Sequence, residues 1–150
     1  MEPSDFLRDV EKRMKPGVIS LRGFLGDDAR PLEEILAADD AAIRRLGLTH
    51  ERIAERLAHF THLALAGYGT PMREADFEVV ADEARGYVRS PFGDLQRFRK
   101  GEIRLTNLAT GDTLTWTPLL VHMIRNHGFY EGKGAVYRLD PDKVKRVLQL

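Results

Sequence analysis

Six side chains that can bind ligands or exchange protons are concentrated near the C-terminal end of the chain. They are His122, Arg125, His127, Tyr130, Glu131 and Lys133. A short helix is predicted to begin at Pro118, with Thr117 as its N-cap, and to end at Gly128, because glycine readily adopts the left-handed conformation of a helix end. A glycine-rich loop follows. We therefore predict that the helix-loop segment 117–134 holds a small anionic ligand or a protein partner.

Within this segment, His127 falls on the apolar face of the predicted helix, in its last turn, where a polar ring needs a hydrogen-bond partner. One interpretation is a structural histidine that donates to a backbone carbonyl. The other is a site residue at the mouth of a pocket formed with Tyr130, Glu131 and Lys133. His122 is predicted on the solvent-facing side, roughly 140° around the helix from His127. The sequence therefore predicts that the two rings do not point together.

Acid–base catalysis is the alternative function that these residues support. His127, Glu131 and Asp94 have the side chains with which a small hydrolase or isomerase moves protons, with or without a metal ion. Nucleophilic serine chemistry is not expected, because no serine stands in a Gly-x-Ser-x-Gly sequence. Thiol chemistry is excluded because the chain has no cysteine. Both functions, a binding module and an enzyme, stay open at this point.

Three further residues have the spacing of metal ligands. Glu55, His59 and His62 stand at i, i+4 and i+7 of a helix predicted to follow Thr49, which is a spacing that can present three ligands to one ion. The stripe lies opposite the apolar face of that helix, where such side chains usually meet water. We therefore predict no tight metal site there, and no cofactor.

Two motifs that often bind phosphate or nucleic acid are incomplete in this chain. The loop 128–134 contains glycines and Lys133, but it follows a helix, is one residue too short for a phosphate-binding loop and is followed by Ala135 where Ser or Thr would reach Mg²⁺. Basic residues gather at 97–100 with Arg104, beside Phe98. They can either bind a nucleic-acid strand, with the aromatic ring stacking on a base, or guard a sheet edge against pairing with another chain. Acidic and basic residues number 23 each, so no net charge favours nucleic acid. We predict no useful nucleic-acid affinity at physiological salt.

The composition is that of an ordinary globular chain, with 43% hydrophobic and 31% charged residues. Residues 1–5 do not resemble the start of a signal sequence, and no run approaches the roughly 18 apolar residues of a membrane span. We therefore expect a cytoplasmic protein with no membrane partner. A homo-oligomer is compatible with the sequence.

Hydrophobic periodicity predicts a single α+β domain over residues 1–150, with N-terminal helices, a central antiparallel sheet of about four strands and two C-terminal helices. The predicted strands are residues 77–82, 86–89, 102–108 and 113–116, and shorter extended segments are expected at 18–21 and 135–139. Packing of the helix after Thr49 on this sheet predicts one core. Its expected members are Leu57, Val79, Ile103, Leu105 and Trp116.

One acidic residue conflicts with the expected helices. A helix that opens at Pro31 and runs straight would place Asp39 inside its apolar stripe. Because burying a carboxylate is unfavourable, we predict a break, with Asp39 or Asp40 capping a second helical piece. A straight helix with a buried Asp39 is the other interpretation.

Overall fold

The computed structural model describes residues 3–150, with side chains from Asp5 onward. This part of the chain forms five helices and one four-stranded sheet. In chain order they are α1 (Pro3–Arg13), α2 (Leu32–Arg45), α3 (His50–Leu65), β1 (Met72–Glu74), β2 (Phe77–Arg89), β3 (Arg97–Asn107), β4 (Thr113–Trp116), α4 (Pro118–His127) and α5 (Pro141–Leu148). No helix within residues 3–150 has the length and apolar character needed to cross a membrane.

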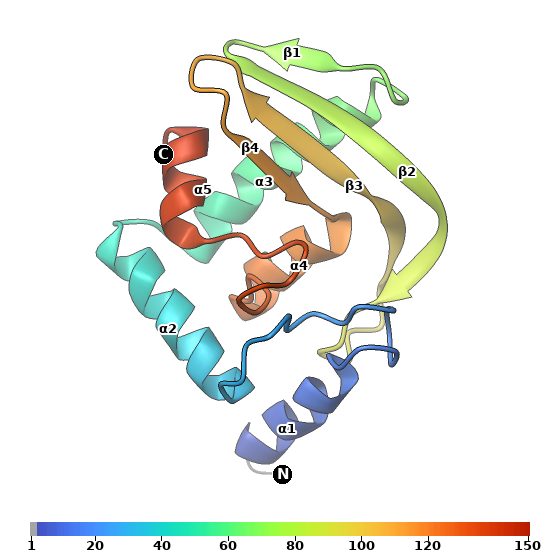
Figure 1. Ribbon diagram of the computed structural model, residues 1–150, viewed down its shortest axis with the longest axis vertical. Helices are drawn as coiled ribbons and strands as arrows, with labels where there is room; N and C mark the ends of the chain where they lie inside the picture. Colours follow the sequence, from blue (N-terminus) through green and yellow to red (C-terminus); the bar gives the residue numbers. More distant parts are fainter. Residues whose placement is uncertain (1–2) are drawn as a thin grey trace.

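The sheet is antiparallel throughout, and its strands lie side by side in the order in which the chain makes them (Figure 1). Helix α3 packs against β2 and β3, and α4 packs against α3 and β3. Helix α5 contacts β4 and α2, while α1 contacts α2. The predicted α+β arrangement, with helices before the sheet and two helices after it, is confirmed.

The hydrophobic core forms where α3 and α4 meet the sheet. All five predicted core residues are buried there: Leu57, Val79, Ile103, Leu105 and Trp116. The indole N–H of Trp116 donates to the Thr61 hydroxyl at 2.8 Å, and that hydroxyl donates to the Leu57 carbonyl at 2.7 Å. The polar atoms that enter this core are therefore hydrogen-bonded, as burial requires.

The strands β2 and β3 are longer than predicted and form one curved hairpin. Strand β2 runs through the region where two separate strands were expected, with an irregular register between Glu83 and Tyr87. Gly101 allows this curvature, because its φ is +121° and a Cβ atom there would lie 2.7 Å from the carbonyl oxygen of Asp82. The curve carries the end of the hairpin toward the segment that follows α1 (Figure 1). Strand β1, which is only three residues long, was not predicted.

Two segments predicted to be extended form turns instead. In the first, the N–H of Gly17 donates to the carbonyl of Ser20, and in the second the N–H of Arg138 donates to the carbonyl of Ala135. Neither residues 18–21 nor residues 135–139 pair with the sheet. A short apolar run with no neighbouring strand has no partner for its backbone groups, so local turns satisfy them.

The predicted break at Asp39 is wrong. Helix α2 is continuous, and Asp39 is buried within it. Arg138, far along the chain, donates from both terminal nitrogens to this carboxylate, at 2.5 and 2.9 Å. Because this two-point ion pair satisfies the buried charge, the helix does not need to expose it.

Candidate functional site

Helix α4 has the boundaries that the sequence predicted. The Thr117 hydroxyl accepts from the N–H of Leu120 at 3.1 Å, and Pro118 occupies the first turn. The helix ends at Gly128, whose φ is +62° and whose N–H donates to the carbonyl of Ile124. A Cβ atom on Gly128 would lie 2.9 Å from Nε2 of His50, so both conformation and space favour glycine here.

Contrary to the prediction, His122 and His127 point to the same atom. Nε2 of His122 lies 2.8 Å and Nε2 of His127 lies 2.9 Å from Oδ2 of Asp94. Asp94 belongs to the loop between β2 and β3, which passes alongside the last turns of α4. The positions of His122 and His127 on the helix place the rings on different sides. Because the Asp94 carboxylate lies between them, both rings nevertheless turn toward it. We call these three residues the Asp94 cluster.

Aromatic side chains pack against both rings of the Asp94 cluster. Phe92 stacks on His127, with ring centroids 4.0 Å apart and planes 4° apart, and Phe98 lies 4.6 Å from the ring of His122. The Asn126 amide donates to Nδ1 of His122 at 3.0 Å and to the His122 carbonyl at 3.1 Å. His122 is therefore half-buried rather than solvent-facing, and its ring is held on three sides.

The charge of Asp94 is maintained by its neighbours. Partial burial acts to raise the pKa of Asp94, but hydrogen bonds from His122, His127 and Ser90 outweigh it and lower the pKa to about 2. The carboxylate is therefore ionised at neutral pH. An anion between two imidazole rings can orient them, accept their protons or share a cation with them.

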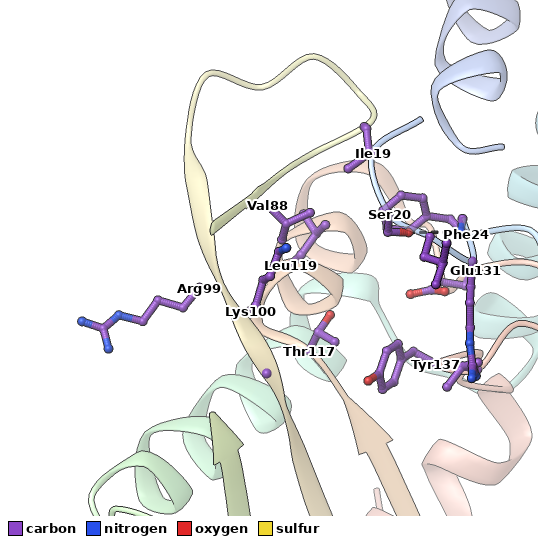
Figure 2. A pocket seen from close by; sticks show the side chains of 15 residues that line it. Ile19, Ser20, Phe24, Val88, Arg99, Lys100, Thr117, Leu119, Glu131 and Tyr137 are labelled. Atoms are coloured by element: carbon purple, nitrogen blue, oxygen red, sulfur yellow. Dashed lines mark hydrogen bonds between the residues drawn. The ribbon is translucent and has the colours of Figure 1, made fainter. Parts of the chain in front are cut away.

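A separate cavity of about 580 Å³ lies between the curved hairpin, the segment 19–24 and the loop that follows α4 (Figure 2). Its polar wall includes Thr117, Glu131, Tyr137 and Lys100. Its apolar wall is made by Ile19, Phe24, Val88, Leu119 and Val136. We call it the Glu131 cavity.

Glu131 is the buried acid of this cavity. Its residue surface is 3% exposed, and burial raises its pKa to about 8. No hydrogen bond joins its carboxyl group to another side chain within residues 3–150, and this part of the chain contains no fully buried side-chain oxygen without a partner. The carboxyl oxygens must therefore reach the cavity, and in Figure 2 they point into it, as the hydroxyl of Tyr137 does. At neutral pH the group is a protonated acid that can donate a hydrogen bond.

The remaining members of the predicted ligand-binding set lie elsewhere. The hydroxyl of buried Tyr130 lies 2.8 Å from Nδ1 of His50, whose Nε2 lies 3.0 Å from Asp40. Lys133 is exposed, and its backbone N–H donates to Asp28. Arg125 is exposed at a shallow groove that His127 and His50 also line. The sequence analysis therefore grouped residues that the structure places apart. Glu131 lines the Glu131 cavity, whereas His127 lines the shallow groove.

The helical stripe on α3 does not form a three-ligand group. Nε2 of His59 lies 2.9 Å from the Glu74 carboxylate, and neither Glu55 nor His62 joins this contact. Among the described residues, the group of three metal-type ligands is instead the Asp94 cluster. Sequence reasoning had singled out all three of its members, but not their grouping. It missed Lys100 and Tyr137 of the Glu131 cavity, for which local sequence carries no signal.

Comparison of the chain with protein-family models, with curated proteins and with solved structures found no match in any of the three.

Proposed function

We propose that the protein is a binding module that holds a small organic acid in the Glu131 cavity. The proposal rests on the carboxyl group of Glu131, which is buried, faces the cavity and has a pKa raised by burial to about 8. At neutral pH this group can donate its O–H to the carboxylate of a ligand. An ionised acid at the same place would repel an anion, so the raised pKa favours an anionic ligand.

The rest of the cavity wall fits the same class of ligand. Lys100 and Arg22 supply positive charge, and Thr117 supplies a hydroxyl. The apolar wall favours a ligand that carries an apolar body beside its charged group. A volume of about 580 Å³ lies within the usual range of roughly 300–1,000 Å³ for small-molecule sites.

Organic-acid binding is tested by thermal shift at pH 7 with hexanoate, benzoate and inorganic phosphate. We expect an organic acid to raise the melting temperature, since a ligand at 100 times its Kd stabilises by about 2.7 kcal/mol. The Lys100→Ala variant is expected to lose most of this shift. Arg99→Ala is the matched control. Arg99 precedes Lys100 and borders the cavity, but its side chain points away from it, so the substitution removes a positive charge beside the cavity and none inside it (Figure 2).

The pH dependence adds a second measure of the same binding. The shift is expected to fall between pH 7 and pH 9, as Glu131 ionises and its negative charge opposes the ligand. If none of the acids raises the melting temperature, or if Lys100→Ala and Arg99→Ala behave alike, the cavity is not the ligand site.

A hydrolase or isomerase centred on His127 is the second candidate. It is favoured by the contact between Nε2 of His127 and Asp94, because a carboxylate that accepts from one ring nitrogen orients the ring and leaves Nδ1 available as a base. Glu131 lines the other cavity and is not part of this arrangement. Turnover of an activated ester that disappears in His127→Gln but persists in His62→Gln would support it. Equal rates in both variants would exclude it.

A further inference from the structure

We propose that the Asp94 cluster is a binding site for a divalent transition-metal ion of the zinc class. Oδ2 of Asp94 and Nε2 of both His122 and His127 lie within 4.8 Å of one another. Two histidines and one carboxylate are a frequent ligand set of zinc and of non-haem iron sites. The site is separate from the Glu131 cavity, so metal binding and organic-acid binding can each fail without the other.

The distances within the cluster are close to those around an ion. Two donor atoms that each lie about 2.1 Å from a tetrahedral zinc ion are about 3.4 Å apart. The separations between Asp94 Oδ2 and the two ring nitrogens are 2.8 and 2.9 Å. An ion can therefore replace the two shared protons if each ring nitrogen moves away from the carboxylate by about half an ångström.

The surroundings of the cluster suit an ion that exchanges with solvent. The side chains of Asp94, His122 and His127 are 27%, 16% and 22% exposed, so an ion can reach them. Phe92 and Phe98 pack against the rings and restrict their rotation. Such preorganisation lowers the entropic cost of gathering three ligands on one ion.

The ligand types select the class of ion. Imidazole nitrogens favour zinc, cobalt, nickel, iron and copper, whereas magnesium and calcium prefer sites made of oxygen atoms alone. Three protein ligands leave at least one coordination position for water, as in catalytic rather than structural zinc sites. The second candidate function is a hydrolase or isomerase centred on His127. If that activity requires Zn²⁺, the ion rather than His127 would activate the water.

Asn126 is a positioning residue for this site. When Nε2 of His122 binds an ion, the ring proton resides on Nδ1 and needs an acceptor. Asn126 contacts Nδ1 at 3.0 Å, and half a turn of its amide would present the oxygen. This rotation gives up the hydrogen bond that the amide donates to the His122 carbonyl at 3.1 Å, but Asn126 is exposed, so the freed N–H groups can donate to water. Aspartate at this position would present only acceptors and should strengthen metal binding.

The test is calorimetric titration of the chelator-treated full chain with Zn²⁺, together with the visible absorption spectrum of the Co²⁺ form. We expect one Zn²⁺ per chain with micromolar or tighter affinity, and Co²⁺ bands that indicate nitrogen ligands. His122→Gln and His127→Gln are each expected to weaken binding by more than about 100-fold, which exceeds the usual effect of losing a residue that only orients a ligand. His59→Gln is the control, since His59 pairs with Glu74 outside the cluster.

The Asn126→Asp variant keeps the test decisive if a glutamine variant does not fold. It is expected to bind Zn²⁺ about 10-fold more tightly than the unchanged chain. The proposal is overturned if the unchanged chain binds no Zn²⁺, if binding survives both glutamine substitutions, or if His59→Gln abolishes it. Weaker binding by Asn126→Asp would contradict the geometry around His122.

Discussion

Replacing Asp39 with alanine is expected to lower the free energy of unfolding by about 3–5 kcal/mol, because it leaves the buried Arg138 guanidinium with only the exposed carboxylate of Asp140, 3.8 Å away, as an ionic partner. The Asp39 and Arg138 side chains are 7% and 12% exposed, so little water can replace the lost carboxylate. Arg138 also donates to the carbonyl of Glu131 at 2.9 Å. The Asp39→Ala substitution is therefore also expected to loosen the loop that carries Glu131. Urea denaturation of the variant and the unchanged chain measures the effect.

Two controls separate the cost of an unpaired charge from the cost of losing an ion pair. The double variant Asp39→Leu with Arg138→Met is expected to be much closer to the unchanged chain, because it removes both charges. Arg45→Ala removes an exposed pair with Asp142 and is expected to cost about 1 kcal/mol or less. A loss below about 1 kcal/mol for Asp39→Ala would mean that water reaches Arg138 and that the pair is not a buried one.

The second large effect is expected from Glu131→Gln. As pH rises, the free energy of unfolding of this variant should increase relative to that of the unchanged chain. Burial raises the pKa of Glu131 from 4.5 to about 8 in the folded chain. Below about pH 4.5, the carboxyl is protonated in both the folded and the unfolded state. Between pH 4.5 and 8, only the folded chain retains the proton, so the free energy of unfolding falls with rising pH. Above pH 8 the group is ionised in both states and the slope ends.

The size of this effect follows from the difference between the two pKa values. The pKa difference from 4.5 to about 8 corresponds to a decrease of about 4–5 kcal/mol in the free energy of unfolding of the unchanged chain across this pH range. Glutamine cannot ionise, so the difference between Glu131→Gln and the unchanged chain should grow by that amount between pH 4.5 and 9. Denaturant unfolding at several pH values measures it. A difference that stays constant with pH, as expected for the exposed Glu55→Gln control, would show that Glu131 is ionised in the folded chain at neutral pH.

Helix α4 contributes to both candidate sites from its two ends. Thr117 and Leu119, at its beginning, line the Glu131 cavity, whereas His122 and His127, in its later turns, belong to the Asp94 cluster. The apolar residues between them pack against α3 and the sheet. One rigid helix therefore positions side chains of both candidate sites. A rigid element holds functional side chains more precisely than a loop does.

Local signals in the sequence were sufficient for most of the elements. The boundaries of α4 followed from the sequence alone, because each depends only on neighbouring residues. The Thr117 hydroxyl caps the start, Pro118 needs no hydrogen-bond acceptor in the first turn, and Gly128 adopts the left-handed conformation at the end. The buried faces of α3 and β3 also followed, because hydrophobic periodicity is a property of consecutive residues. This is why Leu57 of α3 and Leu105 of β3 were placed correctly in the core.

Only the tertiary structure decided which polar groups meet. Asp39 could remain inside a straight helix because Arg138 reaches it from the end of the chain, and periodicity carries no information about such a partner. His122 and His127 converge because the loop with Asp94 passes beside α4, although their helical positions alone point them apart. Contacts between distant residues depend on how the elements pack, and a buried or shared charge is tolerated only where packing supplies its partner. The sequence by itself therefore determined the helices, the sheet and the core, whereas the grouping of charged side chains into two sites was decided by the tertiary fold.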